Sequence, residues 1–213
     1  MAINDLCKII KDAVFPRFCF GCKKEGSLLC DDCFVFWQPD LLKIDEQNKL
    51  IYFWQYADVI ARELICAWKY DYDSSAWEII QRKLSPSLAG LRHFSHIHEI
   101  EAIIPVELHK RKMCERGFDQ AVMISEFLGA ELEIPVVRVL KRVRSTGQQA
   151  ERSESDRVEY MKDNPFIVKS LLQTASVLLV DDVFTTGATI NAASEVLKKH
   201  GVTSIWRCTL AKG

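Results

Sequence analysis

The apolar residues of this chain fall into short continuous runs that alternate with stretches of helical spacing. The runs predict strands at residues 50–56, 99–106, 134–140, 166–168, 177–180 and 203–210. Helical spacing occurs at Ile60, Leu64 and Trp68, at Trp77, Ile80 and Leu84, at Met123 and Phe127, and at Ile190, Ala193 and Leu197. The last part of the chain, residues 177–210, reads as a βαβ unit, and such units nearly always make parallel sheets. The pattern therefore predicts an α/β fold organised around a parallel sheet.

The stretch that follows strand 177–180 carries the clearest candidate chemistry. Two adjacent acids, Asp181 and Asp182, precede a small hydroxyl-rich loop at residues 185–189, which leads into a helix. In a parallel sheet, the carboxyl end of a strand is the usual ligand crevice. Hydroxyl and backbone N–H groups at a helix N-terminus favour a phosphate, whereas the two acids suit ribose hydroxyls, a Mg2+ ion, or both. A generic strand–turn–helix with a polar turn is the alternative, but that structure alone does not require two acids before such a loop.

Four of the eight cysteines are clustered near the N-terminus in the pattern C-x2-C-x7-C-x2-C. Each C-x2-C pair can place two thiolates on one metal ion, and two pairs complete a tetrahedron, so the spacing predicts a structural Zn2+ site. Four thiolates leave no open coordination position, so this zinc would not be catalytic. Disulfides and a redox C-x2-C are the alternatives, which a reducing compartment and the two adjacent pairs disfavour. The predicted ligands are Cys19, Cys22, Cys30 and Cys33, and the ordinary thiols are Cys7, Cys66, Cys114 and Cys208.

Composition narrows the compartment and the classes of partner. The 213 residues are 48% hydrophobic and carry a formal net charge of -1, so a sizeable core is expected and global basicity does not indicate nucleic-acid binding. No apolar run reaches the ~18 residues of a membrane span, so no membrane insertion is expected. Charges interrupt residues 1–15, which therefore do not read as a signal peptide, and the cytoplasm is the expected compartment. A shared helical face predicts a short docking helix there, rather than a membrane-surface helix, from Ile3, Leu6, Ile10 and Ala13.

The densest basic segment of the chain follows strand 99–106. It contains Lys110, Arg111, Lys112 and Arg116. In a parallel sheet these residues lie at the same edge as the aspartates, where positive charge would suit a pyrophosphate group beside a divalent ion. The alternative is a solvated charge run.

Two further cationic regions are less specific. Asp58 is placed to cap a helix that ends at Trp68, Lys69 and Tyr70, and Lys69 is more simply interpreted as a surface lysine than as a phosphate contact. Residues 141–164 form a long polar connection, which is typical of a lid that closes over a charged substrate. A disordered loop without a role is the alternative. The arginines of this connection include Arg142, Arg144, Arg152 and Arg157.

The stretch Val177–Thr189 resembles the 5-phosphoribosyl-1-pyrophosphate (PRPP) motif of the type I phosphoribosyltransferases. Over nearly its whole length the chain resembles the ComF family, which comprises competence-associated, phosphoribosyltransferase-like proteins. Beyond the PRPP motif and the four cysteines, the resemblance rests on Trp68-Lys69-Tyr70, Ile104-Pro105-Val106, Arg116-Gly117-Phe118 with Gln120, and the residues Arg142, Arg144, Thr146, Gln149 and Arg157.

This resemblance implies a type I phosphoribosyltransferase fold, a parallel sheet flanked by helices, with a small N-terminal four-cysteine zinc module. Residues 1–48 would hold the N-terminal helix and the zinc module, and residues 49–213 the phosphoribosyltransferase-like domain, in which residues 49–97 would cover the ligand crevice. The resemblance also implies binding of PRPP with Mg2+, with Asp181 and Asp182 as the catalytic acids that hold the ribose hydroxyls. The other PRPP-binding residues would be Thr185, Thr186, Gly187, Ala188, Thr189, Lys110, Arg111 and Arg116.

Three residues depart from the usual pattern of the family. Glu107 replaces a proline, and Asp119 and Tyr160 each replace an asparagine. Glu107 and Asp119 add negative charge near the expected position of the pyrophosphate.

The resemblance implies a role in natural competence, in which incoming single-stranded DNA is handled inside the cell. The expected partners are PRPP, single-stranded DNA and a competence helicase or DNA-processing protein. Aromatic residues such as Trp37, Trp54 and Trp77 would stack on a single strand, unless they belong to the core. The second function considered is an active phosphoribosyltransferase of nucleotide or base salvage, which transfers the phosphoribosyl group of PRPP to a nitrogen nucleophile.

Overall fold

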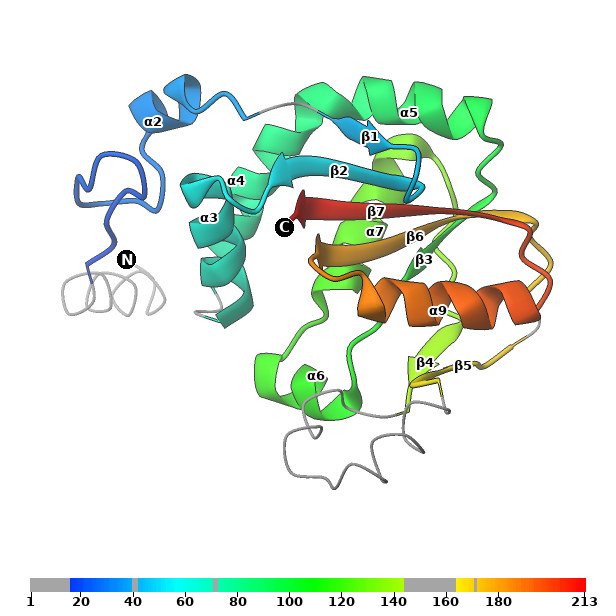
Figure 1. Ribbon diagram of the computed structural model, residues 1–213. Helices are drawn as coiled ribbons and strands as arrows, with labels where there is room; N and C mark the ends of the chain where they lie inside the picture. The colour runs from blue at the N-terminus through cyan, green and yellow to red at the C-terminus, as the bar shows by residue number, and fades with distance from the viewer. Residues whose placement is uncertain (1–15, 40–41, 71–72, 144–163, 171) are drawn as a thin grey trace.

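A five-stranded sheet in the order β1-β2-β7-β6-β3 forms the centre of the protein (Figure 1). The computed structural model describes residues 16–39, 42–70, 73–143, 164–170 and 172–213. Strand β1 runs antiparallel to β2 at one edge, whereas β2, β7, β6 and β3 pair in parallel. The predicted parallel sheet is therefore confirmed, with one antiparallel edge strand added. The strands are β1 (Lys43–Asp45), β2 (Leu50–Gln55), β3 (Ala102–Pro105), β6 (Ser176–Phe184) and β7 (Ser204–Lys212).

Helices cover both faces of this sheet. Alternate residues of a strand point to opposite faces, and in β6 Leu178 and Val180 join one buried cluster while Val177 and Leu179 join another. The first cluster includes residues of α3, α4, α5 and α7, and the second includes residues of α9 and of a small antiparallel sheet, β4–β5. The bounds are α2 (Asp31–Phe36), α3 (Val59–Tyr70), α4 (Ser74–Leu84), α5 (Leu88–Ile97), α6 (Lys110–Arg116), α7 (Gln120–Leu132), α9 (Ala188–Lys199), β4 (Leu140–Arg142) and β5 (Phe166–Val168), with a 3-10 turn at Ser85–Ser87.

The N-terminal cysteine segment is fixed to the caps of two helices. Asp58 Oδ1 accepts a backbone N–H from the first turn of α3 at 3.0 Å, as predicted, and its Oδ2 accepts the Trp37 indole N–H at 3.0 Å. Asp73 caps α4, and its Oδ2 lies 3.3 Å from Nη1 of Arg17. The same two carboxylates thus cap the N-termini of two helices and hold the segment that contains the four cysteines.

The structure differs from the expected element positions in three places. Strand β2 lies inside the main sheet, so residues 99–106 are not its first strand, and residues 49–97 contribute to the sheet as well as to α3, α4 and α5. Strand β1 also joins the sheet, although it precedes the expected boundary after residue 48. Residues 134–140 pair with β3 only through a bridge between Val136 and Ile103, because the chain then turns into β4.

Two expected segments lie outside the described residues. These are the N-terminal docking helix within residues 1–15 and most of the predicted lid, residues 144–163. Across the described part of the chain, no helix combines the length and the apolar character that a bilayer span requires.

Candidate functional site

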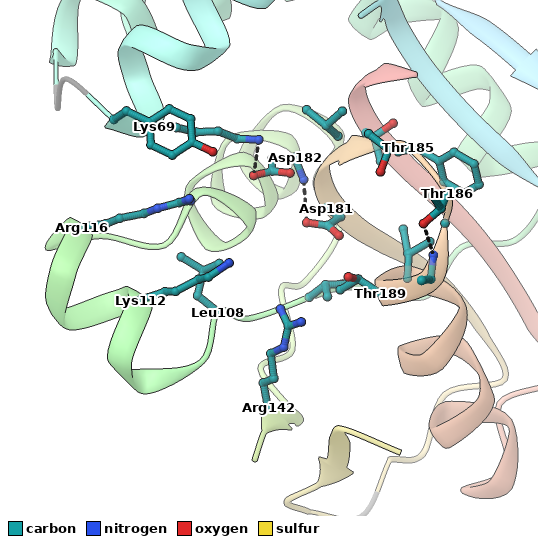
Figure 2. Close-up of a pocket in the computed structure, with 18 residues that line it drawn as sticks. Lys69, Leu108, Lys112, Arg116, Arg142, Asp181, Asp182, Thr185, Thr186 and Thr189 are labelled. Carbon is teal, nitrogen blue, oxygen red and sulfur yellow. Dashed lines mark hydrogen bonds and ion pairs between the residues drawn. The ribbon is translucent and has the colours of Figure 1, made fainter. Parts of the chain in front are cut away.

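The carboxyl ends of three parallel strands surround a polar cavity of about 230 Å³ (Figure 2). The strand register places Pro105 of β3 beside Val180 of β6, and Thr209 of β7 beside Asp181. The aspartate pair and the basic segment after β3 therefore meet at one edge of the sheet, as the sequence predicts. The polar residues lining the cavity are Lys69, Tyr70, Lys112, Arg116, Arg142, Asp181, Asp182, Thr185, Thr186, Thr189 and Thr209.

The two aspartates are held by different partners. Asp182 Oδ2 lies 2.7 Å from the Lys69 ammonium, and Asp181 Oδ1 accepts the backbone N–H of Asp182 at 2.8 Å. Burial and the neighbouring charge of Asp182 raise the pKa of Asp181 to about 8. The charges of Lys69 and Arg142 act in the opposite direction, but burial outweighs them and favours the protonated form of Asp181.

The loop between the aspartates and α9 is shaped around Gly187. This residue adopts a left-handed conformation with φ 73° at the N-cap of α9, and a Cβ there would meet Cζ of Phe184 at 2.6 Å. Thr186 Oγ1 accepts the backbone N–H of Ala188 at 3.4 Å. The first backbone N–H groups of a helix have no acceptor within it and carry the positive end of the helix dipole. The loop and the start of α9 therefore offer donors and hydroxyl groups to an anion.

Three cationic side chains extend into the cavity from α6 and β4, as Figure 2 shows. Lys112 and Arg116 are four residues apart on α6 and so share one face of that helix, while Arg142 comes from β4. Burial and the nearby charges of Arg142 and Arg116 lower the pKa of Lys112. The cations repel one another, so an anion placed between them would be stabilised.

Lys110 and Arg111 lie elsewhere on the same helix. Both are exposed and neither lines the cavity, and Nε of Arg111 lies 3.0 Å from Oε1 of Glu115. The basic segment was expected as one patch, but its helical conformation turns only Lys112 and Arg116 towards the aspartates.

Two residues at the cavity have a different structural setting from the one that the sequence predicts. Lys69 was interpreted as a surface lysine, but it is buried, with 9% of its surface exposed. It continues the buried stripe of Ala61 and Ile65 at intervals of four residues, and this position at the end of an apolar stripe was the signal that could have found it. Arg142 was placed in the predicted lid, whereas it belongs to β4, is buried, and lies over the ring of Phe166.

The four N-terminal cysteines converge at a second site. Their Sγ atoms all lie within 4.8 Å of one another, and the Sγ–Sγ distances from Cys30 are 3.7 Å to Cys19 and 3.6 Å to Cys22. A tetrahedral Zn2+ with Zn–S bonds of about 2.3 Å separates its sulfur ligands by about 3.8 Å, so the cluster is compatible with structural zinc. A Cβ at Gly21 would lie 2.7 Å from Sγ of Cys33, which explains the glycine in the first C-x2-C turn.

Comparison with known proteins identifies the family of this chain. Residues 119–213 match the family described as phosphoribosyl transferase domain. The chain is 31% identical to Competence protein F of Haemophilus influenzae, across 100% of this chain and 92% of that protein. The chain belongs to the ComF family. It is also 27% identical to Competence protein ComFC of Bacillus subtilis, across 92% of this chain and 77% of that one, and 26% identical to DNA utilization protein YhgH of Salmonella typhimurium, across 64% and 60%.

The described departures from the ComF pattern do not place negative charge in the cavity. Glu107 faces away from it, with Oε1 lying 3.2 Å from Nε of Arg138 and 3.4 Å from Nζ of Lys169. Asp119 is buried at the N-cap of α7, where its oxygens accept the backbone N–H groups of Leu108 and of Val122 in the first helical turn. Tyr160 lies outside the described residues. The type I phosphoribosyltransferase fold with a four-cysteine module, which the resemblance implies, is confirmed.

Proposed function

We propose that this ComF protein binds PRPP with Mg2+ in the cavity at the end of β6. One observation carries the proposal: a carboxylate pair, a hydroxyl-rich helix N-terminus and four cations, Lys69 among them, line a single cavity of about 230 Å³. The Thr185–Thr189 loop would hold the 5-phosphate, and Asp181 and Asp182 would accept hydrogen bonds from the ribose hydroxyls. Mg2+ is a hard cation that favours carboxylate and phosphate oxygens, so the same aspartates and the pyrophosphate suit it.

The pyrophosphate would lie against the cationic side of the cavity. Arg116 keeps its expected role there, and Lys112 and Arg142 join it because they line the cavity. Burial and the repulsion of Arg142 and Arg116 lower the pKa of Lys112, which supports this assignment because an anion between the cations would relieve the repulsion. Lys110 and Arg111 would act only at the rim, because both are exposed and outside the lining.

The names of the relatives support a role in natural competence and the handling of DNA. In this role, single-stranded DNA would contact the exposed cations Lys110 and Arg111 beside the cavity, and a competence helicase or DNA-processing protein would be the protein partner. Trp37, Trp54 and Trp77 are buried and so are not available to stack on bases. DNA binding through Lys110 and Arg111 would rest on phosphate contacts and weaken as salt is added.

The match to the phosphoribosyl transferase domain favours a second candidate, catalysis at the same site. A nitrogen nucleophile would form a bond to the anomeric carbon of PRPP as the carbon–oxygen bond to pyrophosphate breaks, with inversion, and the nucleophile would lose its proton. The aspartates would stabilise charge that develops on the ribose ring, and the cations would stabilise the departing pyrophosphate.

Calorimetry of PRPP with Mg2+ tests the binding proposal. Arg116→Gln removes a cation of the cavity, and Arg111→Gln removes an exposed cation of the same helix as a matched control. Loss of one charge-assisted contact should weaken PRPP binding about tenfold or more in Arg116→Gln, with a change of less than about twofold in Arg111→Gln. Absence of PRPP binding by the wild type, or equal losses in both variants, would refute the proposed site.

Measuring pyrophosphate release with a panel of bases and amines separates binding from catalysis. Release above the hydrolysis background that disappears in Asp181→Asn with Asp182→Asn supports the transferase. PRPP binding without such release supports the binding role alone.

A further inference from the structure

Lys69 of α3 forms an ion pair with the aspartate pair at the end of β6. It lies in the last turn of α3, and its ammonium is 2.7 Å from Asp182 Oδ2, with only 11% of the lysine side chain and 18% of the aspartate side chain exposed. Figure 2 shows the lysine reaching the cavity from the side opposite the Thr185–Thr189 loop.

The end of α3 is fixed on both sides of this lysine. Trp68 is buried and stacks on Trp77, with ring centroids 4.5 Å apart and an interplanar angle of 14°. Tyr70 carries the guanidinium of Arg116 over its ring, 5.1 Å from the centroid. Lys69 itself is buried, so its ammonium lies beside Asp182 largely shielded from solvent.

We propose that Lys69 is a positioning residue of this cavity: its ammonium is the resident counter-ion of Asp182 and competes with a divalent cation for that carboxylate. The inference deepens the proposed function, because it concerns how the same cavity would admit Mg2+. A lysine at Asp182 leaves Asp181 as the one carboxyl group of the pair that a divalent ion can approach without displacing the lysine. Mg2+ sheds its water reluctantly and is commonly held by one or two carboxylates together with substrate phosphates, so the cavity by itself would bind it weakly.

Mn2+ titrated into the zinc-loaded full chain, without PRPP, tests this inference. Lys69→Gln removes the positive charge but can still donate a hydrogen bond to Asp182, and Lys69→Arg keeps the charge as a control. Removing a cation this close to a carboxylate should tighten Mn2+ binding at least about tenfold in Lys69→Gln, whereas Lys69→Arg should match the wild type. Free Mn2+ is quantified by its paramagnetic resonance signal, and circular dichroism melting identifies variants that fold.

Equal Mn2+ affinity in the wild type and Lys69→Gln would overturn the inference. A gain that persists when Asp182→Asn is added to Lys69→Gln would overturn it as well, because the ion would then bind elsewhere. If Lys69→Gln does not fold, the comparison of wild type with Lys69→Gln plus Asp182→Asn decides. This double variant removes the ion pair without changing the net charge of the cavity, so Mn2+ affinity should change less than about twofold. A larger loss would show that Mn2+ uses Asp182 in the wild type and would overturn the inference. The Mn2+ titration contains no PRPP, so it tests the role of Lys69 alone. The calorimetry of PRPP described above tests PRPP binding, and the failure of one experiment can therefore be told from the failure of the other.

Discussion

The four-cysteine cluster and the aspartate cavity both bring acidic side chains together, but they are neutralised differently. In the cluster the sulfurs contact one another, and burial and the neighbouring cysteines raise the pKa of Cys33 to about 12. In the cavity, Asp182 has a lysine of the same chain at 2.7 Å. Four thiolates therefore require a metal ion to stay charged together, whereas the aspartate pair is already half neutralised. A site of the first kind suits a permanent ion, and a site of the second kind suits a ligand that comes and goes.

Removing one zinc ligand is the test with the largest expected effect. Metal binding supplies the folding free energy of such small modules, about 10–16 kcal/mol for zinc-finger peptides. Cys22→Ser should abolish stoichiometric zinc and expose residues 16–39 to amide exchange and proteolysis, while β6 stays protected. Cys114→Ser, which changes an exposed cysteine outside the cluster, is the control. Full zinc content in Cys22→Ser would show that zinc binding does not need all four thiolates, and it would contradict the proposed permanent four-thiolate site.

Breaking the ion pair between Lys69 and Asp182 should have the second-largest effect, a loss of stability. Lys69→Met leaves Asp182 without its cation in a mostly buried position, which should lower the free energy of unfolding by about 2–4 kcal/mol. Lys69→Arg should lose less than about half of this. Urea unfolding measures both, and an unchanged stability in Lys69→Met would mean that the cavity is not neutralised from within.

The pH dependence of stability gives a smaller effect with a definite sign. The folded protein holds the Asp181 proton up to a pKa of about 8, whereas an unfolded aspartate releases it near its ordinary value of 3.8. The unfolded state therefore binds fewer protons across this window, and stability falls as pH rises from about 4 to about 8. Asp181→Asn should remove this fall and gain about 1–3 kcal/mol over the wild type between pH 5 and pH 8.

Urea unfolding of both proteins at several pH values measures this difference, and titration of the zinc site cancels because both proteins contain it. A wild-type stability that rises relative to Asp181→Asn across the same window would contradict the assigned pKa.

Neutralising Glu107 should have the smallest effect. Its carboxylate pairs with Arg138 and Lys169 outside the cavity, so Glu107→Gln should change PRPP affinity less than about twofold and stability by less than about 1 kcal/mol. An affinity gain of tenfold would place this charge at the pyrophosphate after all.

Local patterns predicted the part of the site that lies in one continuous stretch. A continuous apolar run followed by two acids and a hydroxyl-rich loop places Asp181 and Gly187 correctly, because strand, loop and helix follow directly from adjacent residues. Arg142 and Lys69 come to the cavity through tertiary packing of β4 and α3, which spacing along the chain does not reveal. Lys112 faces the cavity and Arg111 does not, because these residues lie on different faces of helix α6. The sequence pattern did not predict this helix, so it could not show which basic side chains face the aspartates.

A crystal structure of the protein soaked with PRPP and Mg2+ would show whether PRPP occupies the cavity at the end of β6. We expect the 5-phosphate at the Thr185–Thr189 loop, the ribose hydroxyls at Asp181 and Asp182, and the pyrophosphate against Arg116 and its cationic neighbours. Density for PRPP at any other surface, with the cavity at the end of β6 left empty, would contradict the proposed site.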